Sequence, residues 1–161
     1  MPGSRALLCS YLLPSMYSLG GAAVEEFVYY PAWKVVGATE FPAFHQSLSD
    51  RLIPAFVAPF FLSVLLSGLL IWARPTEVSA KLVLLAFLMN LTIFLATIGW
   101  AIPIQMQLGK EQSLEAIDRL IGIDRPWRLL PGLVVGAANC GILFGLCSGA
   151  GRRALPPPGQ S

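Results

Sequence analysis

Two adjacent carboxylates, Glu25 and Glu26, precede two tyrosines, Tyr29 and Tyr30, at the end of an apolar stretch. On a helix each glutamate lies four residues before a tyrosine, so each pair shares a face and a phenol can donate a hydrogen bond to a carboxylate. Neighbouring helical residues point about 100° apart. We therefore expect one glutamate to face the interior of the fold and the other to face headgroups or water.

Acid–base chemistry would fall to His45, the only histidine of the chain, because an imidazole exchanges a proton near neutral pH. Gln105 and Arg128 could then stabilise developing negative charge. These three are the candidate catalytic residues. The candidate ligand-binding residues are the polar groups near or within the apolar stretches: Glu25, Glu26, Tyr29, Tyr30, Asn90 and Thr97. Alternatively, these side chains cap helices and tie loops to the rest of the fold.

The sequence lacks the motifs of several other kinds of chemistry. The sequence has no phosphate-binding glycine loop, no Ser-His-Asp order with a nucleophile elbow, and no Cys or His cluster of metal spacing. We expect no metal and no cofactor, although a metal held by Glu25, Glu26, His45 and Asp124 stays open. The three cysteines are interpreted as small packing residues. A net charge of +2 is too small to indicate nucleic-acid binding.

The elements that position these residues are apolar helices. Of the 161 residues, 55% are hydrophobic and 12% are charged, against about 25% charged in a soluble domain. Four windows reach the length of about 20 residues that crosses a bilayer. The sequence predicts an all-α membrane protein, a four-transmembrane-helix bundle in one domain (residues 1–151), with a disordered Pro-rich tail at 152–161. The spans are expected at residues 6–30, 52–73, 82–104 and 128–148.

The first window could instead be a signal peptide, with Arg5 as its positive region and "GGAAVEE" as a cleavage site. Its apolar run is longer than the roughly 7 to 15 residues of a signal sequence, which favours a retained span. Lys and Arg are dense in the short segments at the termini and at residues 74–81, and this density favours termini in the cytoplasm, in a bacterial inner membrane.

The loops after the first and third spans, on the opposite side of the membrane, are both predicted to form short amphipathic helices. In "TEFPAFHQSLSDRLIP", Thr39 can cap a helix that carries an apolar stripe. In "SLEAIDRLIGIDRPW", Ser113 can cap a second helix, and Asp124 can cap the fourth span. We expect these helices to lie on the membrane surface or on the mouth of the bundle.

Polar and small residues within the spans predict how the helices face one another. Asn90 and Thr97 share a face that leads to Gln105, and this stripe should face the interior. Pro54, Pro59 and Pro103 should bend their helices and open a funnel, unless neighbouring groups accommodate them. Small residues at Gly132 and Gly136 allow close helix packing, within the chain or in a homodimer. The tryptophans, with Tyr29 and Tyr30, fit interfacial belts: Trp33, Trp72, Trp100 and Trp127.

Three stretches, "VYYPAWKVVGATEFPAFHQSLSDR", "IPIQMQL" and "RLIGIDRPWR", give a resemblance to a family. The chain resembles small bacterial four-span membrane proteins that are similar to the anthrone-oxygenase-like family. The resemblance implies a four-span fold, and its motifs fall on Tyr30, Pro31, His45, Pro103, Gln105, Leu108 and Arg128. At Gln105 the anthrone-oxygenase-like branch is expected to have asparagine, so the sequence departs from that branch there.

These patterns predict a polar cluster of one glutamate with Tyr29, His45, Gln105 and Arg128 at the outer mouth. The expected pocket lies between the first span, the first loop and the end of the third span. The preferred function is binding of a small apolar or amphipathic molecule by a protein whose other partner is the lipid bilayer. One alternative is a cofactor-independent oxygenase or oxidoreductase acting on an aromatic substrate. A second alternative is a structural membrane partner.

Overall fold

A computed structural model describes residues 2–154 of the chain, and the side chains of residues 3–148. The described residues form four long helices joined by short connections, and they contain no strand. Each long helix consists of two α-helical segments on either side of one π-helical turn. The segments are α1 (Pro2–Val24), η1 (Glu25–Tyr29) and α2 (Tyr30–Trp33); α3 (Phe41–Leu52), η2 (Ile53–Val57) and α4 (Ala58–Ala73); α5 (Ala80–Ala96), η3 (Thr97–Ala101) and α6 (Ile102–Leu108); and α7 (Leu114–Asp124), η4 (Arg125–Leu129) and α8 (Leu130–Ala154). The predicted all-α four-helix bundle is confirmed.

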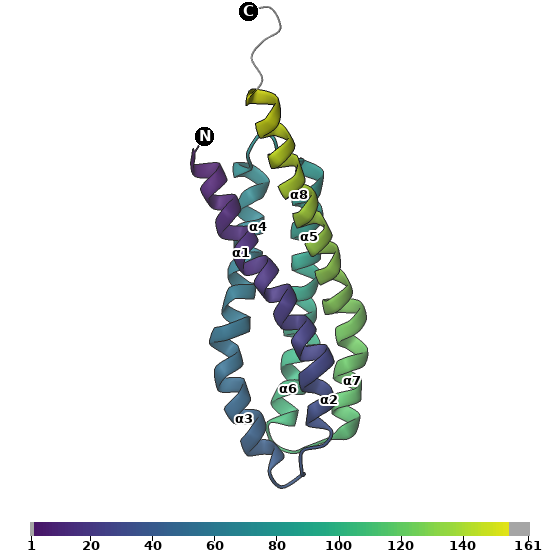
Figure 1. Ribbon diagram of the computed structural model, residues 1–161. Helices are drawn as coiled ribbons and strands as arrows, with labels where there is room; N and C mark the ends of the chain where they lie inside the picture. The colour runs from purple at the N-terminus through teal and green to yellow at the C-terminus, as the bar shows by residue number, and fades with distance from the viewer. Residues whose placement is uncertain (1, 155–161) are drawn as a thin grey trace, which may run out of the picture.

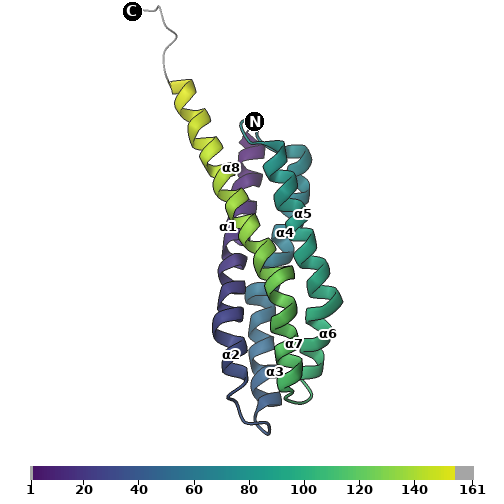
Figure 2. The ribbon, with the colours of Figure 1, turned by 90° about the vertical axis from the view of Figure 1, so that its right-hand side faces the viewer.

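The four helices run up and down in one elongated bundle (Figures 1 and 2). The beginning of α1, the end of α8 and the connection at residues 74–79 lie at one end, which we call the terminal end. The connections at residues 34–40 and 109–113 lie at the other, the loop end. Helix α1 packs mainly against α4, and α5 packs against α8 and α4. The sequence-distant spans one and four also meet, through α1 and α8.

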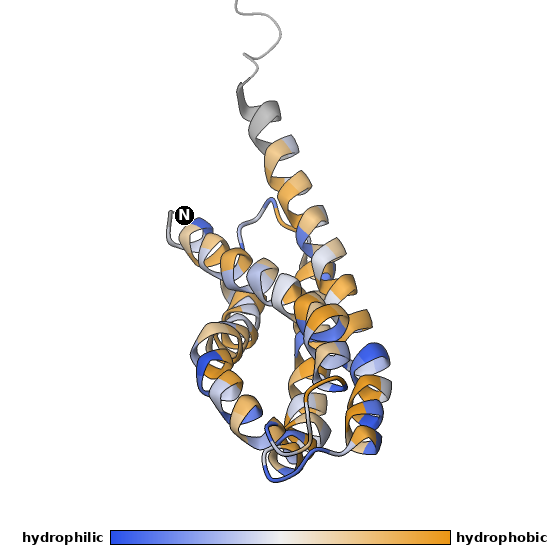
Figure 3. Ribbon diagram, turned by 60° about the horizontal axis from the view of Figure 1, so that its bottom comes forward, coloured by the Kyte–Doolittle hydropathy of each residue, from blue (hydrophilic) through white to orange (hydrophobic). Residues whose placement is uncertain are grey.

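All four helices are long and apolar enough to cross a membrane: Gly3–Trp33, Phe41–Ala73, Ala80–Leu108 and Leu114–Ser148. With 29 to 35 residues each, they measure about 44 to 53 Å, more than the roughly 30 Å of a hydrocarbon core. Hydrophilic residues gather towards the loop end (Figure 3). These helices fit an integral membrane protein whose ends extend beyond the bilayer.

The two predicted amphipathic helices exist as α3 and α7, but they do not lie across the membrane surface. Each continues through a π turn into the span that follows it, so it lengthens the bundle. Ser113 caps α7 as predicted, since its hydroxyl accepts from the Ala116 N–H at 3.1 Å. Helix α3 begins after Glu40 without a side-chain cap, so the cap expected at Thr39 is wrong. Helix α8 runs to Ala154, into the tail predicted to be disordered, and residues 155–161 lie outside the described residues.

Each π turn ends two residues before a proline. The four prolines are Pro31, Pro59, Pro103 and Pro131. A proline lacks the N–H of a helical hydrogen bond, and its ring clashes with the carbonyl four residues back. The helix widens just before each proline, and the N–H that follows the turn bonds to the carbonyl five residues earlier. The distortions predicted in the second and third spans therefore occur in all four.

Two apolar cores stabilise the bundle, one near each end. The terminal-end core consists of Leu8, Tyr11, Leu12, Leu70, Val78, Val83, Ala86, Ala138 and Ile142. The loop-end core consists of Tyr30, Trp33, Phe41, Ala101, Ile104, Leu108, Ala116, Ile117 and Leu120. The π turns lie between these cores in each helix.

The expected aromatic belts are wrong for two residues, because Tyr30 and Trp33 are fully buried in the loop-end core. Trp72 is 81% exposed near the terminal end, and Trp100 and Trp127 are half-exposed neighbours with ring centroids 6.0 Å apart. These three keep positions that suit a membrane interface. The three cysteines are exposed, so they do not fill the interior.

The glycines of α8 pack against helices of the same chain. A Cβ atom at Gly132 would lie 3.3 Å from Leu19 of α1, and one at Gly136 only 2.7 Å from it. At Gly141 it would lie 3.0 Å from Leu82 of α5. The small residues thus let α1 and α5 approach α8 closely, which is the first of the two options for this motif. The homodimer stays a prediction.

Candidate functional site

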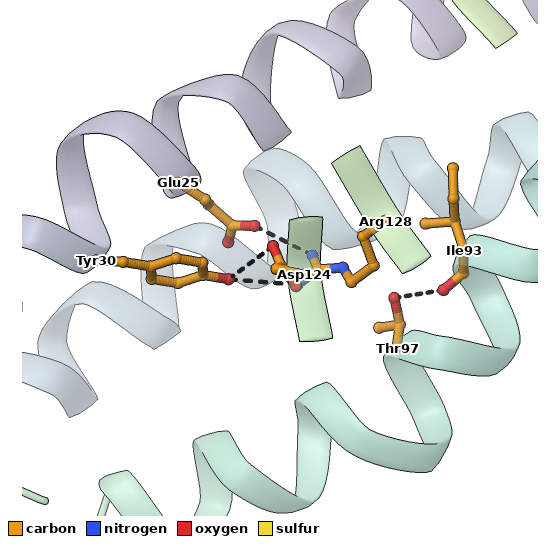
Figure 4. A network of polar contacts seen from close by, with 6 residues as sticks. All are labelled: Glu25, Tyr30, Ile93, Thr97, Asp124 and Arg128. Carbon is orange, nitrogen blue, oxygen red and sulfur yellow. Dashed lines mark hydrogen bonds and ion pairs between the residues drawn. The ribbon is translucent and has the colours of Figure 1, made fainter. Parts of the chain in front are cut away.

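A buried network of charged groups lies among the π turns, with Arg128 of η4 at its centre (Figure 4). Its Nη1 donates to Asp124 Oδ1 at 2.5 Å and to the Tyr30 hydroxyl at 3.3 Å, and its Nη2 donates to Glu25 Oε2 at 3.1 Å. The Tyr30 hydroxyl donates to Asp124 Oδ2 at 3.3 Å. These four residues, which we call the Arg128 cluster, join the first span to the fourth.

The Arg128 cluster is electrostatically unbalanced. Two carboxylates and one guanidinium leave it with a formal charge of −1, and the side chains of Glu25, Asp124 and Arg128 are at most 15% exposed. Burial of charge is costly unless each group is paired and hydrogen-bonded. The Nε of Arg128 is buried and has no partner. The cluster thus retains one charged donor group that the protein leaves unsatisfied.

Glu26 forms a second ion pair beside the Arg128 cluster. Its side chain is fully buried, and its Oε1 accepts from Arg125 Nε at 2.5 Å, although Arg125 is mostly exposed. Both adjacent glutamates therefore point inward, and the expectation that only one would do so is wrong. The reason is that η4 presents two arginines to η1, so each carboxylate has its own cation. The expected Glu26–Tyr30 hydrogen bond is replaced by the contacts of Tyr30 in the Arg128 cluster.

His45 and Gln105, two members of the predicted polar cluster, are in contact. His45 Nε2 and Gln105 Oε1 are 2.8 Å apart, and His45 is only 3% exposed. The imidazole lies against Trp33 and Phe41, with ring centroids 5.1 and 5.6 Å away. Both aromatic neighbours belong to the loop-end core.

The predicted single cluster is instead two separate sites. His45 and Gln105 lie in the loop-end core, and Arg128 with Glu25 forms the charged cluster. Tyr29 is half-buried against the loop-end core. The separation arises because α3 and α6 continue towards the loop end beyond their π turns, which carries His45 and Gln105 away from η4.

A cavity of about 80 Å³ lies between α1, α4, α5 and α8, next to the Arg128 cluster. Glu25, Arg128, Asn90 and Thr97 line it, so four of the predicted residues converge on one space. Ser15, Ser18 and Ser63 add hydroxyls, and the rest of the lining is apolar or glycine: Leu19, Ala22, Phe56, Val57, Phe60, Ile93, Gly132 and Val135. This cavity lies deeper than the pocket predicted beside the first loop, and His45 and Gln105 do not line it.

Two hydrogen-bond donors of the lining have no partner. The Asn90 amide nitrogen is buried and unpaired, as is the Arg128 Nε. The hydroxyls behave differently: Thr97 and Ser63 donate to backbone carbonyls of their own helices at 2.7 and 2.8 Å. Asn90 of α5 and Arg128 of η4, the residues that carry these two donor atoms, thus both line a cavity whose surface is mostly apolar.

The roles of two buried polar residues were not predicted from the sequence. Asn139 of α8 is fully buried, accepts from the Tyr11 hydroxyl at 2.9 Å and donates to Ser15 Oγ at 2.9 Å. An asparagine in an apolar span is the signal that could have found it. Asp124 was interpreted as a cap, but it pairs with Arg128 four residues later. Opposite charges at that spacing on one helix indicate such a pair.

The four residues that were considered as possible metal ligands do not converge on one site. Glu25 and Asp124 pair with Arg128, Glu26 pairs with Arg125, and His45 pairs with Gln105. Within residues 2–154 no group of three or more metal-binding side chains converges.

Comparison of the chain with protein-family models, with curated proteins and with solved structures finds no match. The resemblance to the anthrone-oxygenase-like family therefore stays a prediction.

Proposed function

We propose that this protein binds a small amphipathic molecule inside the membrane, in the cavity beside the Arg128 cluster. The observation that carries this proposal is a mostly apolar cavity lined by two residues, Asn90 and Arg128, that each carry a buried donor atom without a partner. A buried donor without a partner costs about 1–3 kcal/mol, and native proteins rarely leave one unexplained. Interface side chains commonly change rotamer on binding, and such a movement would let an acceptor group of the bound molecule pair with these donors.

The rest of the lining indicates the remainder of the ligand. Leu19, Phe56, Phe60 and Val135 offer apolar surface, and the cavity lies within the candidate spans. Apolar walls with a few convergent polar groups are typical of small-molecule sites. The ligand class supported by this lining has one acceptor group and an apolar body, of which only the part next to the acceptor fits within about 80 Å³.

The geometry supports binding better than the oxygenase hypothesis. His45, the expected base, does not line the cavity, and its Nε2 is engaged by Gln105. A purely structural role is also less well supported, because Leu19 of the same chain already fills the space over Gly132 and Gly136. Neither alternative explains the two unpartnered donors.

The proposed location is a bacterial inner membrane with both termini in the cytoplasm. Arg5, Arg74 and Lys81 lie in short segments at the terminal end, with Glu77 as the acid there. Cations in short segments favour the cytoplasmic side. A reporter enzyme fused to the C-terminus and active only in the cytoplasm tests this orientation, and lack of its activity would reverse it.

The binding proposal is tested by thermal unfolding of the purified protein in lipid nanodiscs. Octan-2-one has an acceptor and an apolar body, whereas octane lacks the acceptor. Octan-2-one should raise the unfolding temperature, with about 2.7 kcal/mol of stabilisation when the free ketone is at 100 times its Kd. Octane should not.

Asn90→Leu removes one unpartnered donor and should reduce the stabilisation by octan-2-one. Ser67→Ala is the matched control, because Ser67 is buried in α4 but does not line the cavity. Equal stabilisation of wild type and Asn90→Leu, or equal effects of octan-2-one and octane, would overturn the proposal.

A further inference from the structure

We infer that the ligand is a single-chain lipid with a neutral carbonyl head, which enters from the bilayer between α1 and α4. In this arrangement the head occupies the cavity beside the Arg128 cluster, and the chain lies in a groove on the outer surface of α1 and α4. The inference rests on the proposed binding function and names its ligand class and its route.

The groove has an apolar lining. It is shallow and open to the outside, and its lining consists of Leu13, Pro14, Tyr17, Pro54, Ala58, Pro59 and Leu62. Leu13 is 75% exposed and Leu62 is 49% exposed. All lining residues belong to the first and second candidate spans. Acyl chains are therefore the surroundings that this groove meets in a membrane.

An aromatic pair separates the groove from the cavity. Tyr17 lines the groove and Phe56 lines the cavity, and their rings are stacked with centroids 5.7 Å apart and an interplanar angle of 18°. Residues next to this pair in the sequence are also divided between the two spaces. Ser18, next to Tyr17, lines the cavity, and Ala58, next to Val57, lines the groove. This stacked pair thus lies between the groove and the cavity.

Gly21 lets the Phe56 ring lie directly on α1. A Cβ atom at Gly21 would lie 2.2 Å from Phe56 Cδ1, closer than any real contact. The Phe56 ring therefore fills the space beside α1 in the partition between the groove and the cavity. Side-chain rotation occurs without unfolding of a helix, and we expect turning of the Tyr17 and Phe56 rings to connect the groove with the cavity.

The cavity also selects the head group. The unpartnered atoms of Asn90 and Arg128 are donors, so the head must supply an acceptor, and an ammonium group cannot. The Arg128 cluster already has a formal charge of −1, which disfavours an anionic head. At about 80 Å³ the cavity is smaller than the roughly 150 Å³ cavity that holds a benzene ring. A neutral carbonyl group with a few neighbouring atoms fits these three conditions.

The test uses dodecan-2-one that carries a photoreactive diazirine near the end of its chain, with the protein in phosphatidylcholine nanodiscs. Labelled peptides are identified by mass spectrometry. Labelling should concentrate at residues 13–17 and 54–62, and unlabelled dodecan-2-one should compete with it. Dodecanoate, dodecylamine and dodecane should compete at least about tenfold less well, a difference of about 1.4 kcal/mol.

Ala58→Trp places an indole ring in the groove where the chain would lie, and it should reduce this labelling by about tenfold, a difference of about 1.4 kcal/mol. Leu65→Trp is the matched control on the same helix, since Leu65 is 68% exposed and does not line the groove. Labelling outside the groove, labelling without competition, or equal labelling of both variants would overturn the inference. If octan-2-one still stabilises the protein through Asn90, the proposed function survives such a failure. If that stabilisation is absent as well, both this inference and the proposed function fail.

Discussion

Removal of Arg128 and removal of Glu25 should have very different effects on stability, although the two residues form one ion pair. Arg128 contacts Asp124, Glu25 and Tyr30, and two of these partners are buried carboxylates. Arg128→Met leaves both carboxylates without a cation. Loss of one partner of a buried pair costs about 3–5 kcal/mol, and we expect a loss in that range for this variant.

Glu25→Gln preserves the shape of the side chain and keeps an oxygen that can accept from Arg128 Nη2. It also removes the excess negative charge, because Arg128 and Asp124 then balance each other at 2.5 Å. The lost charge assistance is offset by this balance, so we expect a change in the free energy of unfolding of about 1 kcal/mol or less.

The measurement is unfolding in mixed micelles by increasing sodium dodecyl sulfate, followed by tryptophan fluorescence. Trp33 reports on the region directly, because its ring centroid lies 5.1 Å from that of Tyr30. Lys34→Met is the control for charge removal at an exposed pair, since Lys34 and Asp118 are 38% and 64% exposed. It should cost at most about 1 kcal/mol. If Glu25→Gln destabilises the protein as much as Arg128→Met, the reasoning from charge imbalance is refuted.

Three further predictions concern single side chains. Asn139→Leu breaks two buried hydrogen bonds and should cost about 1–3 kcal/mol, whereas Asn90→Leu removes an unpaired amide nitrogen and should cost less, by the same unfolding measurement. Gly136→Leu should destabilise the monomer by about 1–3 kcal/mol, because a Cβ atom there already meets Leu19 at 2.7 Å; an unchanged monomer with a lost dimer in cross-linking would contradict this. His45→Ala should lower the unfolding temperature without changing stabilisation by octan-2-one, and loss of that stabilisation would place His45 at the ligand.

Much of the fold was predictable because burial in lipid imposes strong patterns. The four apolar windows specify the helices, and the rarity of polar groups in them placed Asn90 and Thr97 on the inner face. The serine cap at Ser113 is a local feature that depends on three neighbouring residues, and it was also predicted correctly. His45 and Gln105 were expected at the same end of the bundle, and they are in contact there, although the hydrogen bond between them was not predicted.

The rest depends on information that a periodic pattern does not contain. One extra residue in a helical turn hardly changes the hydrophobic periodicity, so the π turns were not predicted. Each of them precedes a proline, such as Pro31 or Pro131, and these prolines are the signal that could have indicated them. The sequence shows two glutamates and several arginines but not their partners, which are fixed only when η1 and η4 pack together. Tyr30 and Trp33 illustrate the same limit, since burial among neighbouring helices overrides the usual interfacial preference.

The Tyr30 hydroxyl links two regions that otherwise share few polar contacts. Its ring belongs to the loop-end core, and its oxygen bonds to Arg128 and Asp124. Arg128 in turn lines the cavity. Any displacement of the guanidinium by an occupant must therefore strain or break a hydrogen bond whose other end is fixed among the aromatic rings around His45. Tyr30 is thus a structural link between the arginine that lines the cavity and the aromatic rings beside His45.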